Sequence, residues 1–127
     1  MAWMSTSELN STLALRPPLA TKFTSFMEAL GSDGSVSQET LDLCRRQVQW
    51  VHGVESNQPD PSPDAKTEAD RAALVVAEKM PYGHHDISDG DVDALKEHFG
   101  EAGAVNLLTA IAMFDATTRM QLVVGGS

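Results

Sequence analysis

Cysteine is nearly absent from this sequence, which has a single one, Cys44, among 127 residues. One cysteine excludes an internal disulfide, a redox couple of two thiols and a metal site built from several thiolates. The sequence also lacks a glycine-rich phosphate loop, a dinucleotide-binding fingerprint and the residue order of a Ser-His-Asp hydrolase. We therefore expect neither a cofactor nor a metal ion.

Positive charge is scarce as well. The chain has 9 Lys and Arg residues against 18 Asp and Glu residues, a net charge of −9. Such a chain repels phosphate backbones and anionic lipids. No Lys or Arg precedes Arg16, so the basic start of a signal peptide is missing. The longest mostly apolar stretch, residues 102–114, is too short to span a membrane. We expect a cytoplasmic protein with no nucleic-acid or membrane partner.

Apolar residues are plentiful and recur at helical spacing. They make up 42% of the chain, which is enough for a core, and their period is closer to 3.6 than to 2. This pattern predicts an all-α fold with a flexible arm over residues 1–14, which carries Trp3, and a single domain over residues 15–127. The expected helices cover residues 17–30, 36–52, 65–80, 89–99 and 102–124, and the predicted N-caps are Ser35, Asp64 and Ser88.

The last expected helix is apolar on nearly all sides over residues 104–114. A helix with this pattern is usually buried. In a chain this short, its covers would be the neighbouring helices together with another subunit. We therefore expect a homo-oligomer.

Polar residues flank the corner at which the second expected helix ends. His52 and Glu55 are separated by only two residues. A histidine beside a glutamate can act as an acid–base pair in catalysis. A histidine at a helix C-terminus can equally be a cation that the helix dipole stabilises. Trp50, one turn earlier, suits a pocket wall, an interface or the core.

The other candidate residues have structural explanations beside the functional ones. Asp115 and Arg119 have the i, i+4 spacing of an ion pair that could hold the last helix or a subunit contact. His84 and His85 suggest a metal site or a neighbouring subunit's pocket, but no third ligand follows at a recognisable spacing, which favours a solvated turn. Cys44 lies in an apolar helical stripe, where free cysteine packs as a small hydrophobe, whereas a reactive thiolate needs exposure and a nearby cation.

Several strings follow one another in the order seen in a known helical family. They are residues 15–19 (LRPPL), 41–53 (LDLCRRQVQWVHG), 70–78 (DRAALVVAE), 87–99 (ISDGDVDALKEHF) and the closing Asp115-x-x-Thr118-Arg119. Together they resemble the carboxymuconolactone decarboxylase/alkylhydroperoxidase D-like (AhpD-like) superfamily over most of residues 15–125. The resemblance implies an all-helical bundle of about five or six helices that assembles into a trimer or a hexamer.

The sequence departs from this family at the redox centre. The peroxidase branch uses a CxxC pair followed by a histidine, but these positions fall here on Val54, Asn57 and Pro61. Asp42 matches the family's acidic residue in the preceding helix, and Arg119 matches its closing arginine. Because thiol peroxidase chemistry in this branch needs an attacking thiolate and a resolving partner, we do not expect that activity here.

The decarboxylase branch needs no cysteine pair and gives the leading hypothesis, cofactor-independent acid–base chemistry on a small organic molecule. In this hypothesis His52 and Glu55 carry protons, and Asp42 orients or relays them. The residues expected to hold the substrate are Arg45, Arg119 and Trp50. A second hypothesis is a catalytically silent scaffold or small-ligand binding protein of the same fold. A third makes Cys44 the thiol of a one-cysteine hydroperoxide reductase.

Overall fold

The computed structural model describes residues 7–32, 34–55 and 57–124, and its described residues form helices and loops without a strand. Five α-helices and two short 3₁₀ helices follow one another along the chain. They are α1 (Ser7–Leu13), α2 (Pro17–Ser32), α3 (Gln38–His52), η2 (Ser62–Asp64), α4 (Glu68–Lys79), η3 (His84–Asp86) and α5 (Asp89–Val124). The prediction of an all-α fold is confirmed.

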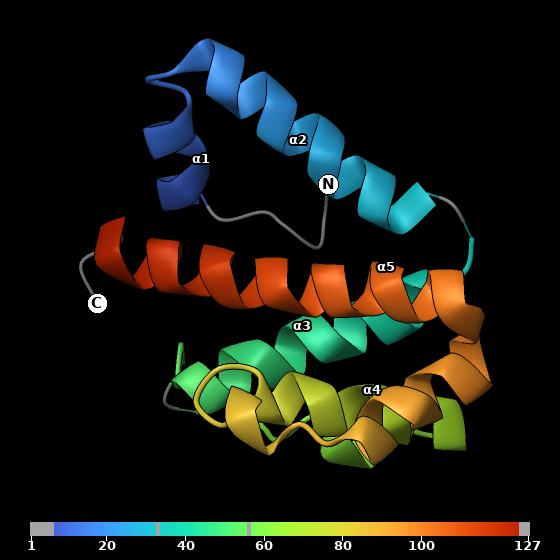
Figure 1. Cartoon of the computed structure of the whole chain (residues 1–127). Helices are drawn as coiled ribbons and strands as arrows, with labels where there is room; N and C mark the ends of the chain where they lie inside the picture. The colour runs from blue at the N-terminus through green and yellow to red at the C-terminus, as the bar shows by residue number, and fades with distance from the viewer. Residues whose placement is uncertain (1–6, 33, 56, 125–127) are drawn as a thin grey trace.

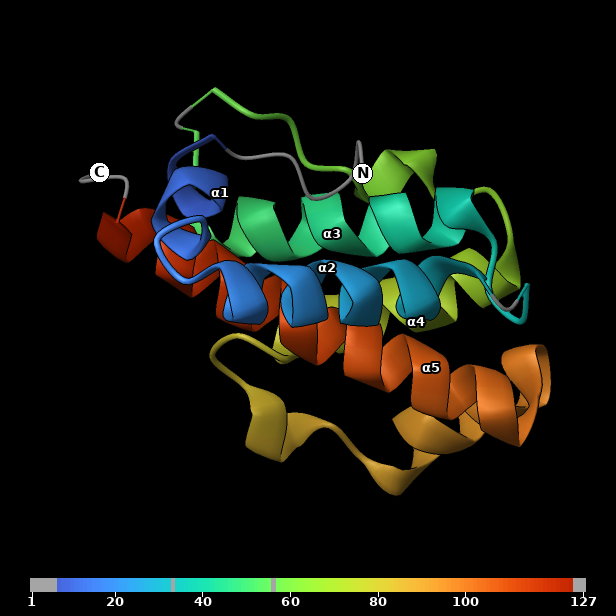
Figure 2. The same cartoon turned by 90° about the horizontal axis from the view of Figure 1, so that it is seen from above.

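Helix α5 runs through the middle of the molecule and contacts all four other α-helices. Helices α1 and α2 lie on one side of it and α3 and α4 on the other (Figure 1). Seen from above, α5 runs obliquely to α2 and α3 (Figure 2). The core lies where α3, α4 and α5 meet, and α2 adds Met27 and Leu30 to it. Its largest fully buried side chains include Phe114, Met27, Leu41, Leu95, Leu107 and Ile111.

Side-chain caps explain where the helices begin. Ser37, rather than the predicted Ser35, accepts a hydrogen bond from the backbone N–H of Thr40 at the start of α3. Thr67, rather than the predicted Asp64, caps α4, because Asp64 belongs to the preceding η2 turn. The predicted cap at Ser88 is confirmed by reciprocal hydrogen bonds with Asp91 at 3.0 and 3.1 Å.

Helix α5 joins the last two predicted helices across a kink. Gly100 at the kink has φ 76° and ψ 171°, a conformation that strongly favours glycine. The second part of the helix is buried on one side only, since Val105, Met120 and Val123 are exposed. The helices of the same chain therefore cover only part of this helix, and the expected cover by another subunit stays a prediction. By length and composition alone α5 could cross a membrane, a criterion that core helices of soluble proteins also meet.

The arm predicted over residues 1–14 is wrong for Ser7–Leu13, which form α1. Leu9 of this helix is buried, and α1 packs against both α2 and α5. The short apolar stripe that anchors it is too brief to stand out as a period in the sequence. Trp3 lies outside the described residues.

Candidate functional site

His52 is placed by the end of α3. Gly53 follows it in the left-handed conformation, and the N–H groups of Gly53 and Val54 bond to the carbonyls of Trp50 and Gln49. This double bond pattern is a Schellman motif, which ends a helix and turns the chain away. The His52 side chain is only 1% exposed. The helix end therefore directs the ring into the protein rather than into solvent.

Both ring nitrogens of His52 contact polar groups from distant parts of the chain. Nε2 lies 2.6 Å from Oδ1 of Asp115 on α5, and Nδ1 lies 3.0 Å from the hydroxyl of Tyr82, in the turn after α4. The Tyr82 side chain is exposed, as the residue is 63% accessible. The ring of His52 thus connects a part-buried carboxylate with a phenol that reaches the surface.

Arg119 contacts both partners of His52, Asp115 and Tyr82. Its Nε donates to Oδ1 of Asp115 at 3.1 Å, so the predicted pair of Asp115 and Arg119 is confirmed. Its Nη2 donates to the carbonyl of Pro81 at 2.5 Å, and its guanidinium carbon lies 5.3 Å from the centre of the Tyr82 ring. We call Tyr82, His52, Asp115 and Arg119 the His52 network.

The hydrogen-bond distances within the His52 network would allow a proton to pass between Tyr82 and His52. When the imidazole is neutral and Asp115 is ionised, Nε2–H donates a hydrogen bond to the carboxylate, which leaves Nδ1 as an acceptor for the Tyr82 hydroxyl. Transfer of the phenol proton to Nδ1 would give an imidazolium beside Asp115 and a phenolate beside the Arg119 cation. Both new charges would then lie next to an opposite charge, which is the arrangement that acid–base catalysis needs.

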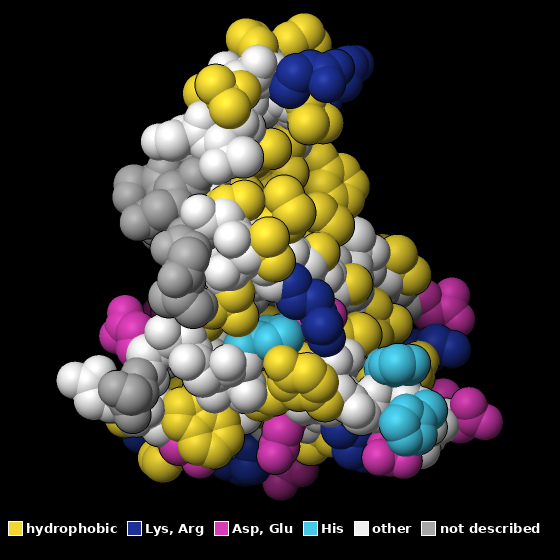
Figure 3. Space-filling view, turned by 90° about the vertical axis from the view of Figure 1, so that its left-hand side faces the viewer, with side chains coloured by type: hydrophobic (Ala, Val, Ile, Leu, Met, Phe, Trp, Pro, Cys, Tyr) yellow, Lys and Arg dark blue, Asp and Glu magenta, His cyan; other side chains and the backbone are white. Residues whose placement is uncertain are grey.

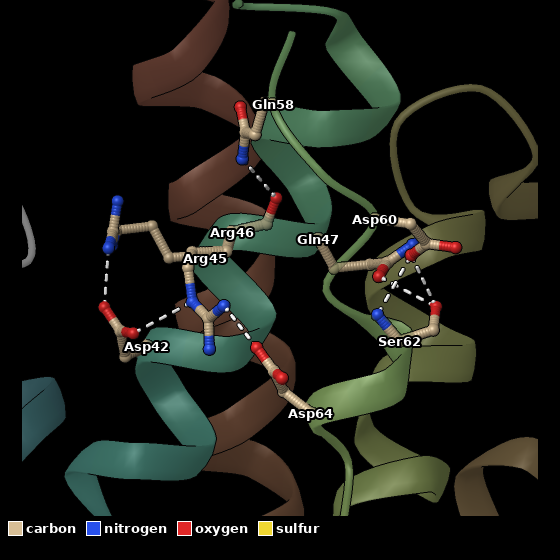
Figure 4. A network of polar contacts seen from close by, with 8 residues as sticks. All are labelled: Asp42, Arg45, Arg46, Gln47, Gln58, Asp60, Ser62 and Asp64. Carbon is tan, nitrogen blue, oxygen red and sulfur yellow. Dashed lines mark hydrogen bonds and ion pairs between the residues drawn. The ribbon is translucent and has the colours of Figure 1, made fainter.

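A second polar cluster surrounds Asp42 on α3 (Figure 4). Its carboxylate accepts from Arg45 at 2.5 Å and from Arg46 at 3.1 Å, and Arg46 reaches on to Asp64 at 2.9 Å. Partial burial of Asp42 opposes its ionisation, but the hydrogen bonds and charges of Arg45 and Arg46 outweigh this and lower its pKa. Asp42 is therefore a fixed anion that orients two arginines, which does not suit it to relay protons.

Arg45 and Arg46 also line an open cavity of about 380 Å³, which we call the corner pocket. Its other lining residues are Gln49, Val54, Glu55, Gln58 and Gln121. The Nε2 of Gln58 donates to the backbone carbonyl of Arg46 at 3.4 Å, so the loop after α3 is tied to the helix. The wall of the corner pocket consequently carries both signs of charge and three amides.

The structure separates the predicted catalytic and substrate-binding residues into two groups. His52 and Arg119 belong to the His52 network, whereas Glu55 and Arg45 line the corner pocket and Asp42 lies beside it. The predicted pairing of His52 with Glu55 is not observed, because both nitrogens of His52 are taken by Asp115 and Tyr82.

Two other candidates have places of their own. Trp50 is 38% exposed, so it is not a core residue, and it lines neither the corner pocket nor the His52 network. Cys44 is buried, as the structural explanation predicts, and burial together with the charge of Asp70 raises the pKa of its thiol far above the ordinary value. A thiol in this setting contradicts the one-cysteine reductase hypothesis.

His84 and His85 lie exposed in η3, where their rings meet edge to face with ring centres 5.5 Å apart. Among the described residues, no group of three His, Cys, Asp or Glu side chains is arranged to hold a metal ion. Tyr82 is the member of the candidate site that sequence reasoning missed. Its signal, a tyrosine in a Pro-Tyr-Gly turn, gains meaning only when His52, 30 residues away, is brought next to it.

Comparison with family models, with curated proteins and with solved structures found no match to this chain.

Proposed function

We propose that this protein catalyses cofactor-independent acid–base chemistry on a small organic molecule, with the hydroxyl of Tyr82 as the group that exchanges protons with the substrate. The observation that carries the proposal is the buried ring of His52, which bridges Asp115 and an exposed tyrosine at hydrogen-bond distances of 2.6 and 3.0 Å. The resemblance of the sequence to the AhpD-like superfamily, whose decarboxylase branch needs no cysteine pair, agrees with chemistry of this class.

The roles follow from the contacts. Tyr82 acts as the general acid or base, and His52 takes or returns its proton. Asp115 fixes the ring and stabilises the imidazolium form, and Arg119 stabilises the phenolate and is near enough to attract an acidic substrate. These roles differ from the predicted ones, since Glu55 and Asp42 are replaced by Tyr82 and Asp115.

The test is proton abstraction from a panel of small carbon acids. Oxo acids and carboxylated γ-lactones are incubated in D₂O, and proton NMR follows deuterium incorporation and decarboxylation. We expect acceleration of at least one compound and a loss of about 100-fold or more in Tyr82→Phe, the range that removal of a general acid or base produces. Lys22→Gln on α2 serves as the control. No acceleration of any compound, or equal rates in Tyr82→Phe, would contradict the proposal.

A catalytically silent, ligand-binding protein is the second candidate. It is favoured by the separation of the corner pocket from the His52 network, because Glu55 and Arg45 can hold a molecule there without reaching the proton-carrying groups. In this case the His52 network only joins α3, α5 and the turn at Tyr82, and the Tyr82→Phe variant would still bind the ligand of the corner pocket.

We also propose that the chain forms a homo-oligomer in the cytoplasm, a trimer or a hexamer as the resemblance implies. Hydrophobic side chains gather on the α1–α2 layer and continue onto α5 (Figure 3). Exposed large hydrophobic residues include Leu19 and Phe26 on α2 and Val105, Met120 and Val123 on α5. Sedimentation equilibrium should give a multiple of the 13.6 kDa chain, and Val123→Asp should dissociate it. A wild-type monomer would contradict this proposal.

A further inference from the structure

The corner pocket has both positive and negative side chains on its wall. Arg45 and Arg46 supply guanidinium groups, and Glu55 supplies a carboxylate. Within the described part of the chain, Glu55 forms no ion pair with either arginine, which pair with Asp42 and Asp64 instead. The charge of Glu55 is therefore available to a ligand.

The arginines keep hydrogen-bonding capacity after their contacts within the protein are made. Arg45 donates from one terminal nitrogen to Asp42 and from the other to Gln49. Its Nε is buried and has no acceptor among the described residues. A guanidinium has five N–H donors in a fork that matches a carboxylate. Because Nε is shielded from solvent, a bound carboxylate would use the second N–H groups of the two terminal nitrogens.

The amides of the pocket wall complement these charges. Gln49 uses its oxygen to accept from Arg45, which leaves its N–H groups for a ligand. Gln58 uses its nitrogen to donate to the Arg46 carbonyl, which leaves its oxygen as an acceptor. The pocket can therefore bind each end of a ligand that has one anionic and one cationic group.

The volume of the corner pocket and the net charge of the protein narrow the class of ligand. A volume of about 380 Å³ is near the lower end for small-molecule sites. A purely anionic ligand is opposed by the net charge of −9 and by Glu55, and a purely cationic one is opposed by the two guanidiniums. We propose that the corner pocket binds a small zwitterion, an α-amino acid, with its carboxylate at Arg45 and its ammonium group at Glu55.

This inference names a ligand class for the pocket on which the second candidate function depends, and it rests on the residues that line the corner pocket. It holds whether or not the His52 network is catalytic. The experiment therefore measures binding without any activity, and the two proposals fail separately.

Calorimetry and ¹H–¹⁵N spectra of the full chain would test it with matched probes. The probes are L-alanine and L-glutamine, propionate as the analogue without the amine, and ethylamine as the analogue without the carboxylate. We expect saturable shifts of the Gln49, Gln58 and Gln121 side-chain amides with at least one amino acid. Both analogues should bind about tenfold more weakly, as expected for the loss of one partly solvated charge contact.

Variants locate the two ends of the ligand. Glu55→Gln and Arg45→Lys should each weaken amino-acid binding about tenfold. Their matched controls on exposed positions elsewhere, Glu97→Gln and Arg71→Lys, should leave it unchanged. Absence of saturable binding by either amino acid would overturn the inference. So would binding of propionate as tightly as L-alanine, or wild-type affinity in Glu55→Gln.

Discussion

His52 and Glu55 are three residues apart, yet they face different surroundings. The His52 side chain is 1% exposed and bonded at both nitrogens, whereas Glu55 is exposed on the wall of an open pocket. Between them lies Gly53, whose left-handed conformation ends α3. The difference shows that sequence proximity at a helix end does not bring side chains together, because the terminating turn sends them in different directions.

The two clusters also use charge differently. In the His52 network a single oxygen of Asp115 serves both His52 and Arg119 in a part-buried setting. Around Asp42, the two arginines remain partly in contact with solvent. Loss of the carboxylate should therefore cost more in the first cluster, since the Asp115 side chain is 18% exposed and that of Asp42 is 42% exposed, so water screens and replaces the contacts of Asp42 more readily.

The largest effect is expected for Asp115→Ala. The change leaves His52 and Arg119 without their shared acceptor, and we expect the free energy of unfolding to fall by about 3 kcal/mol. Urea denaturation followed by circular dichroism would measure it. Asp93→Ala, an exposed acidic position on the same helix, is the control. Equal losses in the two variants would remove the contrast between the clusters.

A smaller, pH-dependent effect is expected for Asp42→Asn. The arginines lower the pKa of Asp42 in the folded protein, so its ionised form favours the folded state above the pKa of the unfolded chain. This contribution is lost as the pH falls through the folded pKa. At neutral pH we expect a loss of about 0.5–1 kcal/mol, reduced by solvent screening. The difference from wild type should vanish in strong acid, and a difference that grows in acid would contradict this account.

The smallest effect on stability is expected for Glu55→Gln. Its carboxylate is exposed and forms no ion pair with Arg45 or Arg46 in the described structure, so the unfolding free energy should change by less than about 0.5 kcal/mol. The same urea titrations measure it. A loss as large as that of Asp115→Ala would show that Glu55 has a structural role and would narrow the contrast between the two clusters.

The sequence predicted the helices well because their apolar periods and turns are local signals. The errors at the caps are local as well. Ser35 and Ser37 are both capable caps two residues apart, and Pro63 draws Asp64 into a 3₁₀ turn before α4 begins. The i, i+4 pair of Asp115 and Arg119 was predictable for the same reason, since both members lie on one helix.

The partners of His52 could not be predicted in this way. Asp115 is 63 residues away along the chain and Tyr82 is 30 residues away, on different elements. Their meeting depends on how α3, α5 and the turn after α4 pack, and no spacing in the sequence encodes that. Sequence reasoning therefore found His52 but assigned it the nearest acidic residue, Glu55, as its partner.

In the proposed His52 network, Nδ1 of His52 accepts a hydrogen bond from the Tyr82 hydroxyl while Asp115 holds the proton on Nε2. Long-range ¹H–¹⁵N correlation spectra of the imidazole nitrogens, recorded at about pH 8, where an ordinary histidine is neutral, would test it most directly. The account predicts a proton on Nε2 and a bare Nδ1 whose ¹⁵N shift changes in Tyr82→Phe. A proton on Nδ1, or an Nδ1 shift that is the same in both proteins, would contradict it.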